Sequence, residues 1–223
     1  MKKFFFTVLM LLAAVFAYSQ YGIIRELSGD VELKTAGSSV FVLAQPGSQI
    51  AQDTIVSTGF RSTAIIAVGS SVITVRPLTR LSLSEIQSSQ GTENLNVNLQ
   101  AGRVRVDVKP PAGTRANTTI QSPSATASVR GTSFEMDILN LDVIEGIVAF
   151  NGNDGSRVLV GAGSSSTITS AGIAENPKNL DTAKLTPLSP VGTSMSGEAF
   201  VSSPVATSPL PPPTAEDVGV EID

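Results

Sequence analysis

The chain of 223 residues has no cysteine, no histidine and no tryptophan. Without cysteine it forms no disulfides, so an exported form would be stabilised by its hydrophobic core alone. Without histidine or cysteine it lacks the commonest general base, nucleophile and metal ligands. These absences predict a protein that is not an enzyme and that holds no cofactor and no metal ion.

The absence of histidine and cysteine does not exclude catalysis by a Ser–Lys pair or by two carboxylates. None of Lys34, Lys109 and Lys178 stands in a Ser-x-x-Lys setting. Asp137 and Asp142 would be able to pair with Glu135 or Glu145, but these acids alternate with apolar residues. Such alternation is typical of the solvated face of a sheet, so we expect these carboxylates to face water.

Charge is also scarce and unevenly placed. The net charge is −4, and it comes mainly from acids in the C-terminal part, with Lys184 as the one base there; the acids are Asp181, Glu198, Glu216, Asp217, Glu221 and Asp223. The remaining body is nearly balanced, which argues against a nucleic-acid partner.

Long apolar runs are confined to the N-terminus. Lys2 and Lys3 precede an apolar stretch over 4–17 that ends in small residues. This pattern predicts a Sec-type signal peptide over 1–19 and a periplasmic or extracellular protein. No later segment is apolar enough to cross a bilayer, so no stable membrane span is expected after cleavage.

Helical periodicity is nearly absent after the leader, and short alternating stretches recur instead. They are 23–24, 31–33, 40–43, 64–68, 72–75, 78–83, 95–99, 104–108 and 143–150. Turn signals every few residues between such strands favour an all-β sandwich, barrel or solenoid over 20–175. Asn153-Asp-Gly155 predicts a hairpin turn, and a calcium loop there is the weaker alternative.

Glycine is expected at the start of several strands, and proline at the C-terminal end of the domain. Gly29-Asp-Val, Gly102-Arg-Val and Gly146-Ile-Val are each expected to start a strand, with glycine permitting the bend. After residue 175 proline becomes frequent, as in the run 208–214. We therefore expect 176–223 to be a disordered, acidic tail rich in Pro, Ser and Thr.

A basic stripe is predicted on one strand. Arg103, Arg105 and Lys109 alternate with Val104, Val106 and Val108, and Asp107 lies among them. The stripe would be able to bind peptidoglycan or another anionic glycan. A plain solvated sheet face is the alternative interpretation.

The stretch ATASVRGTSFEM, 125–136, contains a change of phase. Its apolar residues fall on odd positions up to Val129 and on even positions from Phe134. Arg130-Gly131 stands at this change, which predicts a bulge or corner. Thr132 is suited to bonding nearby backbone, and Arg130 to binding loose carbonyls or Asp137 as a structural clamp. An exposed recognition role for Arg130 is the alternative.

This stretch resembles the hallmark of the FecR domain family. The matching residues are Pro123, Ala125, Ala127, Val129, Arg130, Gly131, Thr132 and Phe134. Upstream, Asp53-Thr-Ile-Val-Ser-Thr-Gly59 and Pro77-Leu-Thr-Arg-Leu81 look like other blocks of the family. The resemblance covers about 22–165, and it implies a short-stranded, twisted β-solenoid or β-sandwich.

The resemblance also implies a role in signalling. Known members are anti-sigma regulators of iron uptake, with a cytoplasmic region and a transmembrane helix before this domain, and neither is seen here. We therefore expect a non-catalytic envelope module that binds other envelope proteins. The alternatives are a glycan-binding module that uses Arg103, Arg105 and Lys109, and an iron-uptake regulator of the anti-sigma kind.

Overall fold

A computed structural model describes residues 21–181 and residue 185. The signal peptide expected over 1–19 and most of the tail expected over 176–223 lie outside the described residues. In the part of the chain that is described, no helix is long and apolar enough to cross a membrane.

The described residues form two open sheets, each of nine strands. Sheet A has the spatial order β18 (Lys178–Asn179), β17 (Ser164–Thr167), β14 (Asn140–Glu145), β13 (Ser133–Asp137), β10 (Arg103–Val108), β7 (Ser71–Val75), β6 (Thr63–Val68), β1 (Gly22–Ser28), β4 (Gln49–Ile50). Sheet B has the order β16 (Arg157–Gly161), β15 (Ile147–Gly152), β12 (Ala125–Val129), β11 (Arg115–Gln121), β9 (Thr92–Ala101), β8 (Arg80–Ser89), β5 (Ile55–Thr58), β2 (Val31–Lys34), β3 (Val42–Leu43). The predicted all-β class is confirmed, in the form of a sandwich.

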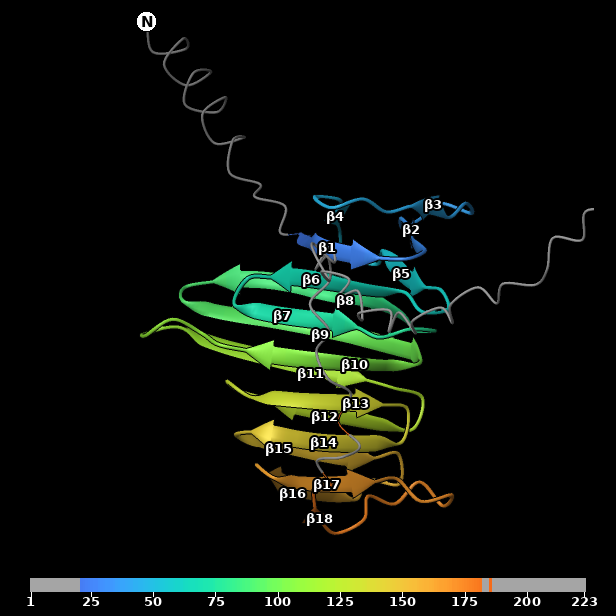
Figure 1. Cartoon of the computed structure of the whole chain (residues 1–223). Coiled ribbons are helices and arrows are strands. Elements are labelled where there is room, and N and C mark those ends of the chain that lie inside the picture. Colours follow the sequence, from blue (N-terminus) through green and yellow to red (C-terminus); the bar gives the residue numbers. More distant parts are fainter. Residues whose placement is uncertain (1–20, 182–184, 186–223) are drawn as a thin grey trace, which may run out of the picture. The chain divides into compact units, whose positions relative to one another are not determined.

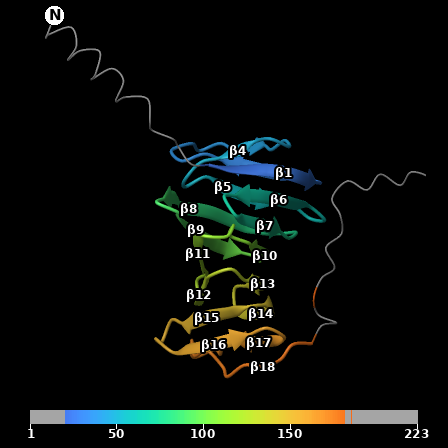
Figure 2. The ribbon, with the colours of Figure 1, turned by 90° about the vertical axis from the view of Figure 1, so that its left-hand side faces the viewer.

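The chain builds both sheets together, mostly one hairpin at a time (Figure 1). After the β6–β7 hairpin in sheet A it crosses to the β8–β9 hairpin in sheet B, and it later crosses back. Only β9 and β11 pair in parallel among the described strands, because the chain passes through β10 in sheet A between them. Figure 2 shows the same succession of strands after a turn of 90°.

Each crossing between the sheets contains a residue with positive φ. These residues are Gly29, Gly47, Asp53, Arg61, Leu78, Gly102, Gly113, Gly131, Gly146 and Gly163. The left-handed conformation turns the chain sharply, so that the next strand starts in the facing sheet. The three Gly-x-Val sites predicted to start strands are among them, since β2, β10 and β15 follow Gly29, Gly102 and Gly146.

Alternating residues of both sheets fill the core. Val104, Val106 and Val108 of β10 point inward and are at most 3% exposed. Phe134 and Phe150 are the largest fully buried side chains among the described residues, and the rest of the core is mainly Val, Ile, Leu and Ala. Burial of these side chains supplies the main stabilising free energy in a chain without cysteine.

Most of the predicted strands and turns hold, with three differences. The stretch predicted over 40–43 is a strand only at β3, and the strand predicted over 78–83 begins at Arg80, because Leu78 has positive φ in the crossing between the sheets. The expected strand over 143–150 is two strands, β14 and β15, in different sheets, because Gly146 has a φ of 84°. The expected hairpin turn at Asn153-Asp-Gly155 is confirmed, with Phe150 opposite Val158 in the β15–β16 pair.

Candidate functional site

The FecR-like hallmark forms a corner between the sheets. Ala125, Ala127 and Val129 point into the core from β12 in sheet B, and Phe134 points into it from β13 in sheet A. The change of phase in the sequence is therefore a change of sheet. After the corner the buried apolar residues fall on even positions instead of odd ones, because the new strand lies in the other sheet and faces the same core from the opposite side.

Gly131 and Thr132 make this corner. Gly131 has a φ of 62°, and Thr132 is 2% exposed. The Thr132 hydroxyl donates to the Ile147 carbonyl at 3.4 Å, and the Thr132 carbonyl accepts from the Val108 amide at 3.0 Å. The corner thereby connects to β10 and β15, as predicted for a threonine that bonds nearby backbone.

Arg130 is not a buried clamp, and that prediction is wrong. Its side chain is exposed, and its Nε donates to Oδ1 of Asn117 at 3.0 Å on the outer face of sheet B. Asp137, the expected partner, binds Arg103 instead. The reason is the corner itself, because the chain changes sheets between Arg130 and Asp137 and their side chains lie on different faces. Pro123, at the other end of the hallmark, is also exposed.

The predicted basic stripe lies on the outer face of sheet A, but its arginines are paired with acids. Nη2 of Arg103 lies 2.7 Å from Oδ2 of Asp137, and Nε of Arg105 lies 3.3 Å from Oδ2 of Asp107. Lys109 is exposed beyond the end of β10. Local pairing of this kind cancels much of the field that would attract a glycan anion.

Glu135 is the most buried acid of this face, which the alternation did not predict. It is 1% exposed, with Arg76 Nη2 at 3.5 Å and Arg103 Nη1 at 3.8 Å. Arg76 is itself 7% exposed and stands next to Arg103 in register. Sequence periodicity places a residue on a face, but it does not show that neighbouring long side chains cover it.

Asp137 is held in its ionised form. Partial burial raises its pKa, but this is outweighed by hydrogen bonds from the Leu139 and Asn140 amides, the Asn140 side chain and Arg103. The pKa of Asp137 is therefore below its usual value. The Asp137 carboxylate thus fixes the turn between β13 and β14, which is a structural use of the acid.

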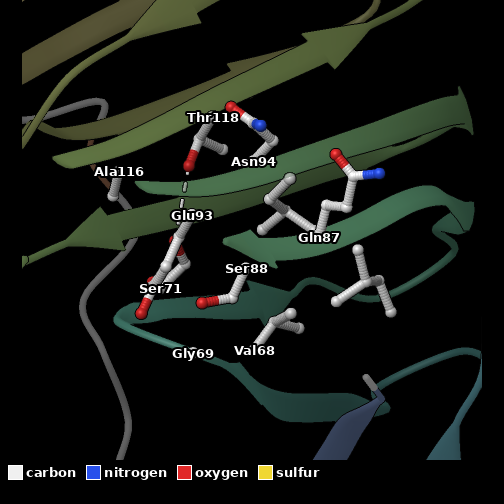
Figure 3. Close-up of a pocket in the computed structure, with 11 residues that line it drawn as sticks. Val68, Gly69, Ser71, Gln87, Ser88, Glu93, Asn94, Ala116 and Thr118 are labelled. Atoms are coloured by element: carbon white, nitrogen blue, oxygen red, sulfur yellow. Dashed lines mark hydrogen bonds between the residues drawn. The ribbon is translucent and has the colours of Figure 1, made fainter. Parts of the chain in front are cut away.

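A small cavity lies where the β6–β7 turn meets β8, β9 and β11 (Figure 3). Its volume is about 30 Å³, which suits one or two water molecules rather than a substrate. Glu93 beside it accepts hydrogen bonds from the amide and hydroxyl of Ser70, at 2.8 and 2.6 Å. The cavity therefore offers no room for a small-molecule reaction.

A wide depression lies on the outer face of sheet B, over β11, β12, β15 and β16. It is open, with a volume of about 820 Å³. Its lining joins two arginines, Arg130 and Arg157, to two exposed apolar side chains, Ile147 and Leu159, which are 62% and 63% exposed. No acid lines it. We call these four residues the β16 patch.

The depression adjoins strand β16, whose outer edge pairs with no other strand among the described residues and is called here the free edge. This edge strand has five residues, whereas the other edge strands β3, β4 and β18 have two each. The Gly152 amide donates to the Ser156 carbonyl, so in this antiparallel ladder every second residue of β16, counted from Ser156, bonds to β15. By that alternation the backbone groups of Arg157, Leu159 and Gly161 face away from β15.

In residues 21–181 and 185, no group of three or more acids gathers in a geometry that would hold a metal ion. The sequence itself contains no histidine or cysteine.

The sequence analysis did not predict the β16 patch, because the exposure of Ile147 and Leu159 depends on which strand lies at the end of the sheet.

The described residues form an all-β domain of two facing sheets that do not close into a barrel. Residues 53–149 match the family model described as FecR protein. This FecR match extends from just before β5 into β15 and includes the hallmark corner. The stretches 22–52 and 150–165, where the resemblance was also expected, lie outside the match.

No curated protein matches the chain. Two crystal structures of a proposed anti-sigma factor from Parabacteroides distasonis ATCC 8503 are similar to it. Each has 16% sequence identity and a TM-score of 0.47. The similarity covers 58% of this chain and 61% of that chain, so this chain spans about three fifths of their length.

Proposed function

We propose that this protein is a non-catalytic, exported envelope protein whose FecR domain serves as a signalling or scaffold module. It binds an extended segment of another envelope protein, which adds as a strand to the edge of β16. The FecR match supports a role in signalling, and the leader over 1–19 supports export. The absence of histidine and cysteine from the sequence supports a binding role over catalysis.

The observation that carries this proposal is the free edge of β16 beside the β16 patch. An edge strand with outward backbone groups is a template for another chain. Arg157 and Leu159 project from the same side of that strand, onto the outer face of the sheet. A bound strand would therefore be favoured by acidic residues facing Arg157 and Arg130, and its apolar residues would contact the exposed Leu159.

Photo-crosslinking in living cells tests this proposal. One probe replaces Ser128, which lines the depression, and a second replaces Val72, which lies opposite Asp107 on the outer face of sheet A. We expect a discrete protein band from the Ser128 probe that weakens when Arg157→Glu is added. A band from the Val72 probe alone, or a band that Arg157→Glu leaves unchanged, would show that β16 is not the docking edge.

The same experiment tests the glycan alternative. A glycan-binding module that uses Arg103, Arg105 and Lys109 would give signal from the Val72 probe that stays with the insoluble wall. A muramidase would then release it. This alternative is weaker, because Arg103 and Arg105 already bind Asp137, Glu135 and Asp107. The anti-sigma alternative has no support from the described residues beyond the FecR match itself.

A further inference from the structure

Gly161, the last residue of β16, is a glycine whose presence the fold does not explain. Its φ lies outside the left-handed region, and nothing lies within 4 Å of a Cβ added to it. Every other glycine among the described residues has a positive φ or a neighbour within that distance. A glycine in a strand weakens the strand, and it often marks a place where a ligand or another backbone approaches closely.

The space left by the absent side chain lies on the outer face of sheet B. Gly161 is opposite Ile147 of β15, and by the alternation of this ladder the two form a non-hydrogen-bonded pair. Facing side chains lie closest in such pairs, so Ile147 lacks the neighbour that a larger residue in place of the glycine would supply. Ile147 is accordingly 62% exposed. We call the open space beside Ile147 the Gly161 notch.

We infer that Gly161 is a specificity-determining residue, because its notch receives a large apolar side chain of the strand that docks on β16, and that side chain packs against Ile147. This inference rests on the proposed function and deepens it by naming the chemistry of the partner's segment. A partner with a small or charged residue at that position would leave Ile147 exposed and would bind more weakly. Burial of apolar surface is the main favourable contribution to such a contact.

Arg157 and Leu159 select the other outward residues of the partner. Arg157 is exposed and forms no ion pair with any described residue, so it favours Asp or Glu opposite it. Leu159 is 63% exposed and favours an apolar residue opposite it. Directly opposed residues on one face lie about 5 Å apart, which is close enough for both contacts. Arg157 and Gly161 are four residues apart, so the partner's acid and its large apolar residue are also four residues apart.

Antiparallel pairing sets the order of these residues along the partner. All paired strands among the described residues are antiparallel except β9 and β11, and antiparallel pairs are slightly more stable per residue. The outward backbone groups of Arg157, Leu159 and Gly161 would each exchange two hydrogen bonds with the residue opposite. From its N-terminal side, the partner's segment therefore has a large apolar residue, any residue, an apolar residue, any residue and an acid. A shift of one residue would turn the acid toward the interior, which disfavours that register.

Peptide binding to the full chain tests this inference. The first peptide, Thr-Phe-Thr-Val-Val-Glu-Thr, places its Phe opposite Gly161 and its Glu opposite Arg157. The second peptide has Ser in place of Phe, and the third has the first sequence in reverse order. We expect the first peptide to bind about ten-fold more tightly than either of the others, measured by titration of the amide chemical shifts of Leu159 and Gly161.

Gly161→Val fills the notch. The variant should fold, because the φ of Gly161 suits an L-residue, the added Cβ meets nothing within 4 Å, and β-branched residues favour strands. We expect Gly161→Val to weaken binding of the Phe peptide about ten-fold and to leave binding of the Ser peptide unchanged. Gln49→Val is the matched control, since Gln49 is exposed on the edge strand β4, and it should change neither affinity.

Ile147→Ser removes the wall of the notch without filling it. Because Ile147 is largely exposed, the variant should keep its fold, and it should lose the preference for the Phe peptide over the Ser peptide. A ten-fold preference that persists in either Gly161→Val or Ile147→Ser would overturn the inference. So would a native chain in which the Leu159 and Gly161 amides do not shift with the Phe peptide at millimolar concentration.

Two further outcomes concern the orientation and the occupant of the edge. Equal or tighter binding of the reversed peptide would overturn the antiparallel order. Shifts of the Leu159 and Gly161 amides that grow with protein concentration alone would show that a second copy of this chain occupies the edge, and they would overturn the inferred partner.

The inference and the proposed function can fail separately. If the Phe peptide binds in a manner that depends on Gly161 while the Ser128 probe captures no protein, the notch is correct and the proposed envelope partner is wrong. If the probe captures a partner in a manner that depends on Arg157, while Gly161→Val changes neither this capture nor the two peptide affinities, the docking edge is correct and the notch is wrong.

Discussion

Arg103 and Asp137 face each other across strands β10 and β13, with 2.7 Å between Nη2 and Oδ2. The pair is partly buried, and Arg103 also lies 3.8 Å from the buried Glu135. These contacts make the centre of sheet A a network of paired charges. On the other sheet, Arg130 and Arg157 form no ion pair with any described residue.

Asp137→Asn should make the protein less dependent on pH for its stability. The pKa of Asp137 is lowered in the folded protein. Its ionised form therefore contributes stability at pH values above the unfolded pKa of about 3.9, and this contribution is lost as pH falls through the folded pKa. The variant should melt below the native protein at pH 7, and the difference should shrink below about pH 4.

The measurement is the melting temperature of both proteins from pH 7 to pH 3. Glu145→Gln is the control, because Glu145 is exposed on β14 and has no ion pair within the described residues. A difference for Asp137→Asn that stays constant across this range would contradict the assigned role of its carboxylate.

The two polar residues of the hallmark corner should differ in their effect on stability. Thr132→Val removes a buried hydroxyl that bonds the Ile147 carbonyl and should cost about 1 kcal/mol. Arg130→Ala removes an exposed side chain and should change the free energy of unfolding by no more than about 0.5 kcal/mol. Denaturant unfolding of both variants checks this, and a larger loss for Arg130→Ala would restore the clamp interpretation.

Local alternation and turn chemistry were enough to predict the all-β class, most strands and the hairpin at Asn153-Asp-Gly155. They act over a few residues, so the sequence contains them directly. The partners of Arg130 and the burial of Glu135 depend on which strands become neighbours, and those neighbours come from distant parts of the chain. The single strand expected over 143–150 failed because Gly146 turns the chain without breaking its apolar pattern.

Gly102→Ala should be among the most destabilising substitutions at a sheet crossing. Gly102 has a φ of 86°, and an added Cβ would lie 2.5 Å from the Thr79 Cα and 2.7 Å from the Leu78 carbonyl oxygen. Because both contacts are with backbone, no side chain can relieve them. We expect a loss of more than about 3 kcal/mol from this clash together with the backbone strain.

Gly163→Ala is the matched control for that substitution. Gly163 stands at another crossing with a φ of 72°, but nothing lies within 4 Å of an added Cβ. Only the backbone strain of about 1–2 kcal/mol should remain there. Unfolding curves of the two variants separate strain from crowding, and equal losses would show that the Gly102 corner relaxes.

Leu159→Ser should remove partner binding while leaving the fold intact. The Leu159 side chain is 63% exposed, so its loss should change the free energy of unfolding by no more than about 0.5 kcal/mol. At a docked strand it would become a buried apolar contact, and its loss should lower capture by the Ser128 probe about ten-fold. Val40→Ser is the matched control, since Val40 is 62% exposed near β3 at another sheet edge. If both variants keep full capture, partner binding does not use β16; if both lose it, the effect is not specific to this edge.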